Sequence, residues 1–299
     1  MKEKQKNQKE QKLALISNPA ARKSSAKTIE LAVRLFEQAG WDVTVLQTQA
    51  GGHATELAKQ AVNDGASLVV AAGGDGTFNE VMNGLAGGAV PMAVLPSGTT
   101  NVLAKELKIP GNARGAVKRI LEGHIREVHV GSMAFPDGCR RKFFLMAGIG
   151  FDAEAVYHVS GKIKKKYGKA GYLAGGLKIL KHWSPEPKIV LIDGNQYLFF
   201  SLVICKGARY GGYPKMAPGA SIMDDELYAV VMSGRKRTDV FRYAFGIITG
   251  LHTRYKDVAY IKCRDVQVLD AARIQADGDY IGNSPVLIET AKEKLKMIF

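Results

Sequence analysis

Residues 67–85 read SLVVAAGGDGTFNEVMNGL, and this stretch decides the fold of the chain. Its first part is a short apolar run with adjacent valines, which is typical of a buried strand. Its last part places apolar residues at Phe78, Val81, Met82 and Leu85, the spacing of one face of a helix. The sequence therefore predicts a strand, a glycine loop and a helix in direct succession.

The predicted loop has three glycines within the four residues Gly73–Gly76. Glycine lets a backbone approach a ligand closely, and the free N–H groups at a helix N-terminus attract anions, so we expect a phosphate here. Asp75 would repel a bare phosphate, and its carboxylate therefore indicates Mg²⁺ or a polar nucleotide hydrogen beside the phosphates. Thr77 is expected to cap the helix. The alternative is an ordinary tight turn.

The glycine loop matches neither of the two common glycine fingerprints, because it lacks the Lys-Ser/Thr ending of a Walker A loop and the GxGxxG spacing. Instead, GGDGT resembles the nucleotide loop shared by diacylglycerol kinases, sphingosine and ceramide kinases, NAD kinases and phosphofructokinases. The loop alone predicts a kinase and leaves its substrate open.

Residues 13–128 show repeated strand and helix patterns. Short apolar strands are expected at 13–16, 42–47, 67–72 and 92–95, with amphipathic helices between them. This alternation predicts a parallel α/β nucleotide-binding domain. Polar loops follow the strands at Asn18, Thr48, Gly73–Asn79 and Thr99, and such loops meet at one crevice in a parallel sheet.

The pattern changes near His129, where strand-like runs follow one another with hairpin signals between them. We expect a mainly antiparallel β domain over residues 129–286. The segment 287–299 is expected to pack back on the first domain. Residues 1–12, with five lysines, are expected to form a disordered basic arm.

Composition restricts the partners and the location. Lys and Arg outnumber Asp and Glu by 42 to 28, a net charge of +14, which favours nucleotides, nucleic acids or an acidic bilayer. No nucleic-acid module is visible, so no nucleic-acid partner is expected. The three cysteines have no paired spacing, which favours a reducing cytoplasm. The longest apolar run, 197–205, is too short to span a bilayer as a helix, so any membrane contact is peripheral, at the inner face.

Residues 160–183 carry seven lysines and no acids, with aromatic and aliphatic residues interleaved. This pattern suits a surface that docks on anionic headgroups. The alternative is a solvated basic helix that packs by its apolar side.

Two acidic clusters of the second half have a functional and a structural interpretation. Asp277-Gly278-Asp279 suits a general base with a neighbour that orients it, but Asp-Gly is also a strong hairpin signal. Asp224 and Asp225 suit a metal site with oxygen ligands or a solvated acidic turn.

Several segments together resemble the bacterial diacylglycerol kinase-like lipid kinases over nearly the whole chain after the arm. They are Asn18-Pro19, GGDGTFNEVMNGL, 96–101, 148–153, Tyr210-Gly211-Gly212, 217–220 and 275–279. The resemblance implies an enzyme that uses ATP and Mg²⁺, with a membrane lipid as its substrate. It also allows a homodimer.

The resemblance assigns roles to residues of this chain. The residues expected to contact ATP are Asn18, Thr48, Gly73, Gly74, Asp75, Gly76, Thr77, Phe78, Asn79 and Thr99. Asp75 is expected beside the phosphates and Mg²⁺. Asp279 falls on the proton acceptor, with Asp277 as its neighbour, and Ser221, Asp224 and Glu226 fall on a structural Mg²⁺ turn.

Two positions depart from the family pattern. Asp279 replaces the Glu of the Asp-Gly-Glu motif and is one methylene shorter, and Asp225 replaces the glycine usual at the Mg²⁺ turn. The sequence thus predicts an ATP- and Mg²⁺-dependent lipid kinase, with diacylglycerol as the expected acceptor. The alternatives are a soluble-substrate kinase such as an NAD kinase, and a catalytically weak nucleotide- or lipid-binding regulator.

Overall fold

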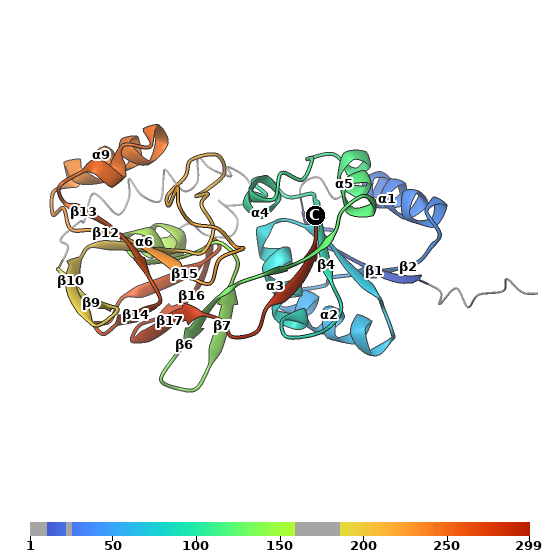
Figure 1. Ribbon diagram of the computed structural model, residues 1–299, viewed down its shortest axis with the longest axis horizontal. Helices are drawn as coiled ribbons and strands as arrows, with labels where there is room; N and C mark the ends of the chain where they lie inside the picture. Colours follow the sequence, from blue (N-terminus) through green and yellow to red (C-terminus); the bar gives the residue numbers. More distant parts are fainter. Residues whose placement is uncertain (1–10, 22–25, 159–185) are drawn as a thin grey trace, which may run out of the picture. The chain divides into compact units, whose positions relative to one another are not determined.

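The computed structural model describes residues 11–21, 26–158 and 186–299, which form two compact units (Figure 1). The first unit contains residues 11–128 together with Glu293–Phe299, and the second contains His129–Lys292. Two expected boundaries change. Gln11 and Lys12 already belong to the first strand, and the return to the first unit begins at Glu293 rather than at residue 287.

The first unit is built on one six-stranded sheet. In spatial order its strands are β2 (Trp41–Gln47), β1 (Gln11–Ser17), β3 (Leu68–Gly73), β4 (Met92–Pro96), β18 (Leu295–Ile298) and β5 (Ile125–Val128). All neighbours are parallel except β18 and β5, which are antiparallel. The central strands β3 and β4 are buried along their whole length, as the apolar runs predict.

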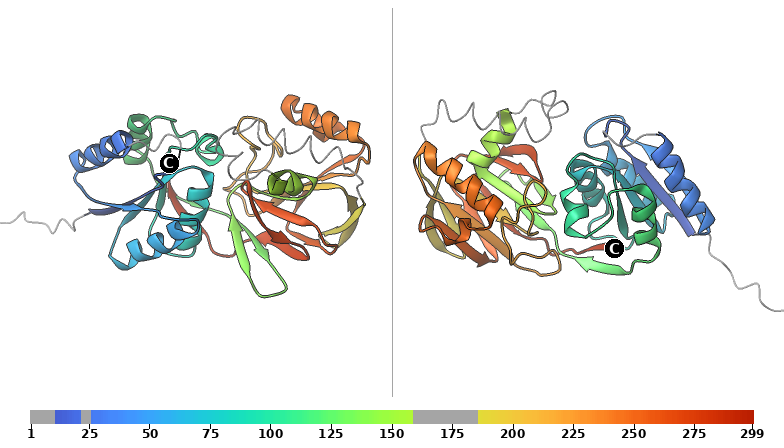
Figure 2. Two further views of the ribbon diagram at one scale, coloured as in Figure 1. Left: turned by 180° about the vertical axis from the view of Figure 1, so that it is seen from behind. Right: turned by 90° about the horizontal axis from the view of Figure 1, so that it is seen from above.

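Helices cover this sheet in two pairs, as Figures 1 and 2 show. They are α1 (Ala26–Gln38), α2 (His53–Asn63), α3 (Asp75–Leu85), the short α4 (Val102–Glu106) and α5 (Ala113–Leu121). Helix α1 packs with α5, and α2 packs with α3. Helix α3 buries Phe78, Val81, Met82 and Leu85, the residues that the helical spacing predicts.

The second unit is a sandwich of two antiparallel sheets. One sheet has the order β10 (Asn195–Phe199), β9 (Lys188–Ile192), β14 (Asp265–Val268), β17 (Val286–Thr290), β6 (Gly131–Ala134) and β7 (Arg140–Phe143). The other has β13 (Val258–Cys263), β12 (Leu227–Met232), β11 (Ser201–Cys205), β8 (Met146–Gly150), β15 (Arg273–Ala276) and β16 (Asp279–Asn283). The expected fold class, parallel α/β followed by antiparallel β, is confirmed.

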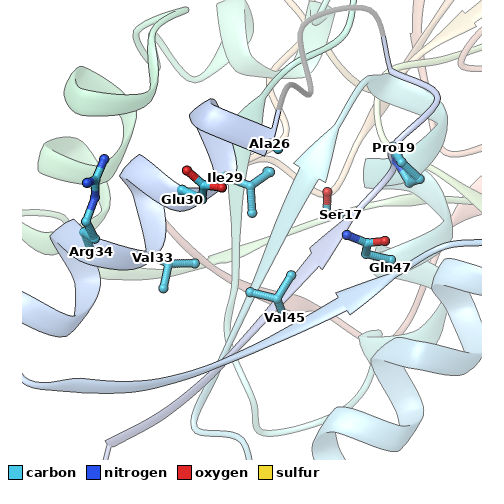
Figure 3. Close-up of a pocket in the computed structure, with 9 residues that line it drawn as sticks. All are labelled: Ser17, Pro19, Ala26, Ile29, Glu30, Val33, Arg34, Val45 and Gln47. Atoms are coloured by element: carbon cyan, nitrogen blue, oxygen red, sulfur yellow. The ribbon is translucent and has the colours of Figure 1, made fainter.

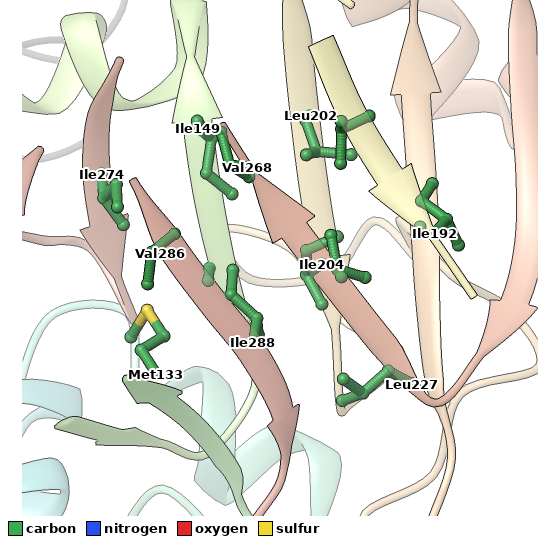
Figure 4. Close-up of a cluster of buried hydrophobic side chains, with 14 of the residues drawn as sticks. Met133, Ile149, Ile192, Leu202, Ile204, Leu227, Val268, Ile274, Val286 and Ile288 are labelled. Atoms are coloured by element: carbon green, nitrogen blue, oxygen red, sulfur yellow. The ribbon is translucent and has the colours of Figure 1, made fainter. Parts of the chain in front are cut away.

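Apolar side chains from both sheets form the core of the sandwich (Figure 4). Ile149 and Ile204 come from one sheet, and Val268 and Ile288 come from the other. The apolar run 197–205 contributes to both sheets, because it is divided at Phe200 into β10 and β11. A run that reads as one strand thus passes from one layer to the next.

Helices of the second unit lie outside its sheets. The described ones are α6 (Phe151–His158), α9 (Arg237–Thr249) and the 3₁₀ turn η1 (His252–Arg254). In the described ranges, no helix has the length and apolar character needed to cross a membrane. The lysine-rich segment 160–183, from which membrane docking was expected, lies outside the described residues.

Candidate functional site

The glycine loop touches the polar loop that follows β4. A Cβ added at Gly98 would lie 2.6 Å from the Gly74 Cα, and one added at Gly73 would lie 2.4 Å from the Thr77 Oγ1. A side chain at position 98 would separate the two loops, and one at position 73 would clash with Thr77 of the same loop, so glycine is needed for close approach at both positions. The result is a pair of backbone-lined loops at the carboxyl ends of β3 and β4.

Asp75 ties these two loops together. Its two carboxylate oxygens accept the N–H groups of Val102, at 2.9 Å, and Leu103, at 3.0 Å, in the first turn of α4. Burial raises the pKa of this carboxyl, and the two backbone hydrogen bonds oppose the rise. The structure thus gives Asp75 a positioning role, while its expected contact with phosphates and Mg²⁺ stays a prediction.

Asn18 and Thr77 meet beside the glycine loop. The Asn18 Nδ2 donates to the Thr77 Oγ1 at 3.2 Å, and the Asn18 N–H donates to the Ala72 carbonyl at 3.0 Å. Thr77 does not cap α3 as expected, because Gly74 is the N-cap residue and Thr77 lies buried inside the first turn. The Thr48 N–H donates to the Ser17 carbonyl at 2.9 Å, which places Thr48 next to the Asn18 segment.

Two further predicted nucleotide contacts have different outcomes. Phe78 is fully buried in the core face of α3, and its N–H donates to the Gly74 carbonyl. Its side chain is therefore a packing group, which corrects the expectation of a nucleotide contact. Asn79 lies partly exposed on α3, where its carbonyl and side-chain oxygens both accept from the Asn83 side chain at 2.9 Å. Thr99 is exposed in the loop after β4.

A pocket of about 560 Å³ lies between α1, β1 and β2 in the first unit (Figure 3). Its lining is Ser17, Pro19, Ala26, Ile29, Glu30, Val33, Arg34, Val45 and Gln47. None of these is a predicted site residue. Ser17 and Gln47 directly precede Asn18 and Thr48, so the pocket adjoins the predicted nucleotide residues without containing them.

Asp277 and Gly278 form the hairpin turn between β15 and β16, with positive φ angles of 48° and 91°. These values are typical of the tight turns that Asp-Gly favours. The Asp277 carboxylate accepts three backbone N–H groups, from Phe144 at 2.7 Å, Leu145 at 2.9 Å and Met146 at 3.1 Å. Asp277 therefore holds the segment that leads into β8. It is a positioning residue in this structure, and its expected part in catalysis, as the neighbour that orients Asp279, stays a prediction.

Asp279 begins β16 directly after this turn and is exposed. It pairs across the hairpin with Ala276, so the turn fixes its backbone. The structural and the functional interpretations of the Asp-Gly-Asp sequence are thus compatible. The turn is a hairpin, and the hairpin presents one carboxylate at the surface.

A buried polar network behind this turn was not predicted from the sequence. Asp152 accepts hydrogen bonds from the Gln275 Nε2, at 2.7 Å, and from the Tyr210 hydroxyl. Gln275 in turn accepts the Gly278 N–H at 2.8 Å. Burial raises the pKa of the Asp152 carboxyl. The network supports the turn that carries Asp279, and its three side chains all come from segments on which the family resemblance was based.

The turn expected to bind structural Mg²⁺ holds a lysine ammonium instead. Lys206 is completely buried, and its Nζ donates to the carbonyls of Ser221, at 3.0 Å, Glu226, at 3.2 Å, and Asp224. The Glu226 side chain pairs with Lys262. The predicted ligands do come together, but the ammonium fills the space between them, so Mg²⁺ does not fit. Burial lowers the pKa of Lys206 to about 8. Because this value still lies above neutral pH, the ammonium stays largely protonated at pH 7.

Family models match both units of the chain. Residues 12–133 match the diacylglycerol kinase catalytic domain, and residues 146–299 match the YegS C-terminal NAD kinase beta sandwich-like domain. A diacylglycerol kinase of Bacillus subtilis (strain 168) is 30% identical over 281 residues, covering 91% of this chain and 90% of the relative. A diacylglycerol kinase of Staphylococcus aureus (strain MRSA252) is 28% identical, covering 91% and 87%.

Solved structures show the same fold. The crystal structure of a diacylglycerol kinase from Bacillus anthracis (strain Sterne) has a TM-score of 0.78 at 24% identity and covers 97% of each chain. Another crystal structure from this organism has a TM-score of 0.80 at 25% identity, covering 100% of this chain and 98% of the other. The chain therefore belongs to the bacterial diacylglycerol kinase-like lipid kinase family and is a kinase, a phosphotransferase.

Proposed function

We propose that the chain transfers the γ-phosphoryl group of ATP to the hydroxyl of diacylglycerol, giving phosphatidic acid. The observation that carries the proposal is the close approach of the glycine loop to the loop after β4, where Gly74 and Gly98 leave backbone rather than side chains at the carboxyl ends of β3 and β4. Family membership and the curated relatives named diacylglycerol kinase support the choice of acceptor.

The nucleotide would lie against the loops of the first unit. The N-terminal N–H groups of α3 have no partner within the helix, so they suit the negative oxygens of a phosphate chain. Asn18 and Thr77 would fix one side of the loop, and Asp75 would hold the other side in place. Most of the rate gain in phosphoryl transfer comes from such positioning and from charge neutralisation.

Mg²⁺ would enter with the nucleotide. Among the residues that the structure describes, no cluster of three or more His, Cys, Asp or Glu side chains could hold a metal ion. This fits a magnesium ion that keeps waters and binds through substrate phosphates and one or two carboxylates. Among the residues expected to contact ATP, Asp75 is the one that carries a carboxylate, so it would supply that contact. When bound, Mg²⁺ neutralises charge on the phosphate oxygens.

Asp279 would accept the proton of the lipid hydroxyl. The hydroxyl oxygen then bonds to the γ-phosphorus, the bond from that phosphorus to the bridging oxygen breaks, and ADP leaves. Asp277 and the Asp152 network would fix the backbone that carries Asp279. The shorter side chain, compared with the Glu of the family motif, would require a closer approach of the hydroxyl or a bridging water.

The test is phosphate transfer from labelled ATP to diacylglycerol in anionic mixed micelles, with Mg²⁺. Asp279→Asn is expected to lower kcat by about 100-fold to 10,000-fold, the usual value of a general base. Asp137→Asn is the matched control, since Asp137 is exposed in the β6–β7 turn and an Asn oxygen can still accept the Cys139 N–H. Equal rates for wild type and Asp279→Asn would remove Asp279 as the base.

A second set of acceptors tests the substrate class. The model matched by the second unit is described as NAD kinase-like, so NAD is added as a soluble acceptor without lipid. Labelled NADP would favour a soluble-substrate kinase, and ATP binding without transfer to any acceptor would favour a regulator. We also propose a cytoplasmic enzyme at the inner membrane face, which sedimentation with membranes after cell lysis tests.

A further inference from the structure

Helix α9 presents an apolar face to solvent. Phe241, Phe245 and Ile248 are 55%, 60% and 72% exposed, and Ala244 between them is also exposed. These positions have the i, i+3, i+4, i+7 spacing of a single helix face. Leu251 follows the helix and is 40% exposed. Figures 1 and 2 show α9 at the surface of the second unit.

The opposite face fixes the helix to the rest of the unit. Tyr243 and Gly246 are buried there, and the Tyr243 hydroxyl accepts the Gly234 N–H at 2.7 Å. Arg242 donates to the carboxylates of Asp239 and Asp257. These contacts hold α9 in one orientation, so its apolar face points away from the rest of the unit.

Cations surround this face. Residues 235–257 contain six Lys and Arg residues and two Asp residues, a net charge of +4. Both carboxylates, Asp239 and Asp257, already pair with Arg242. Arg235 and Lys236 precede the helix, and Arg254 and Lys256 follow it, all of them exposed. An apolar helix face with cations at both ends complements an anionic bilayer surface.

We propose that α9 docks this protein on anionic membranes, with Phe241, Phe245 and Ile248 inserted at the headgroup boundary. The choice of a lipid surface over a protein partner rests on this charge complementarity and, for its biological role, on the proposed lipid substrate. The surface differs from residues 160–183, the segment from which the sequence predicted membrane contact.

The test measures vesicle binding by sedimentation, with the full chain and without nucleotide or diacylglycerol. Wild type is expected to bind phosphatidylglycerol-containing vesicles more tightly than pure phosphatidylcholine vesicles, and added salt is expected to weaken binding. Ile248→Gln is expected to lower the affinity for vesicles about tenfold, because the favourable transfer of an isoleucine side chain out of water is lost and corresponds to about that change in affinity. Phe245→Gln is the second variant.

Ile125→Gln is the matched control, since Ile125 is 58% exposed on β5 of the other unit. It is expected to bind vesicles within about twofold of wild type, because an exposed substitution away from α9 removes no docking contact. Unchanged binding by both Ile248→Gln and Phe245→Gln would overturn the proposal. So would self-association of the wild type that Ile248→Gln abolishes while vesicle binding persists, since the face would then belong to a second copy.

Docking and catalysis fail separately. Vesicle binding that depends on α9, without transfer of phosphate to diacylglycerol, would retain the docking surface and reject the proposed acceptor. Transfer to diacylglycerol with vesicle binding that ignores both α9 variants would retain the kinase and reject the docking surface.

Discussion

Asp277 and Lys206 hold two turns of the second unit in opposite ways. Asp277 is an anion that accepts three backbone N–H groups, and Lys206 is a cation that donates to three backbone carbonyls. The sequence suggested chemistry at both turns, a general base at one and a metal at the other. The comparison shows that a charged side chain at a turn can serve to hydrogen-bond backbone groups. At the Asp-Gly-Asp turn, the candidate for the chemical step is then the neighbouring residue Asp279.

Asp75 in the first unit is an intermediate case. It resembles Asp277 in holding backbone N–H groups of a distant segment, but it accepts two instead of three. Lys206 is fully buried, whereas Asp75 and Asp277 are half-buried. If burial and the number of bonds set the value of such a charge, the loss on substitution follows the order Lys206, Asp277, Asp75.

Replacing Lys206 gives the largest expected effect. Lys206→Met keeps the volume but leaves three partly buried carbonyls without their donor, and we expect the free energy of unfolding to fall by about 4 kcal/mol. Urea unfolding at pH 7 measures the loss. Lys215→Met, at an exposed position, is the control and is expected to stay within about 0.5 kcal/mol of wild type. A similar small loss for both variants would contradict the comparison.

A divalent cation sharpens the same case. Lys206→Ala opens space among carbonyl oxygens, which are the ligands that Ca²⁺ and Mg²⁺ take in proteins. Millimolar Ca²⁺ is therefore expected to raise the melting temperature of Lys206→Ala and to leave the wild type unchanged. The measurement is calorimetry without nucleotide. A wild type that a chelator destabilises would show that the turn binds a metal despite Lys206.

Replacing Asp277 is expected to cost less. Asp277→Ala removes the acceptor of three N–H groups, and bonds to a charged group suggest a loss of about 3 kcal/mol in stability. Because Asp279 follows the same turn, kcat is expected to fall as well. Asp277→Asn keeps one oxygen acceptor and is expected to lose less on both measures. An unchanged kcat in a folded Asp277→Ala protein would separate this turn from catalysis.

Replacing Asp75 is expected to lower the free energy of unfolding by about 2 kcal/mol, because two hydrogen bonds to backbone N–H groups are lost. The loss is smaller than for Asp277 because only two bonds are lost and because the unfavourable burial of the carboxylate is removed at the same time. The glycine loop and the loop after β4 should then separate, and KM for ATP should rise more than kcat falls. Steady-state kinetics at saturating lipid make the distinction. A kcat loss without a change in KM would favour a direct role at the phosphates.

The Arg242–Asp257 pair gives the smallest expected effect, because its partners are half-exposed side chains rather than backbone groups. The Arg242 guanidinium lowers the pKa of Asp257 below its ordinary value. A lowered carboxyl pKa adds stability above the ordinary value of about 3.9 and loses it as pH falls through the lowered one. Between pH 6 and pH 3, the free energy of unfolding of the wild type is expected to fall by at most about 1 kcal/mol more than that of Asp257→Asn. Urea unfolding of both proteins at the two pH values measures this difference.

Much of the fold was predictable because it depends on local periodicity. The strand-like runs expected after His129 appear as antiparallel strands such as β12 and β13, and α3 buries the four residues that its spacing selects. The division at Phe200 was not predictable, because both halves of the run are apolar and only their partner strands differ. The strands β17 and β18 depend on pairing across long sequence separations, which spacing does not reveal.

The site was predictable where backbone shape determines it, as at Gly73 and Gly74. Roles that depend on distant partners were not. The N–H groups held by Asp75 lie 27 and 28 residues away, and those held by Asp277 lie 131 to 133 residues away. Lys206 had one local signal, a lysine directly after the buried strand β11, whose charge requires nearby acceptors.

The last strand has a consequence for how the protein is made. In the sheet of the first unit, β5 pairs with β18, and β18 pairs with β4, so β5 joins the sheet only through residues near the C-terminus. A ribosome synthesises residues 129–292 before that strand emerges. The inserted unit can therefore fold while the surrounding one still waits for its last strand. Any stop that removes β18 leaves the edge of β4 open to pairing with another chain.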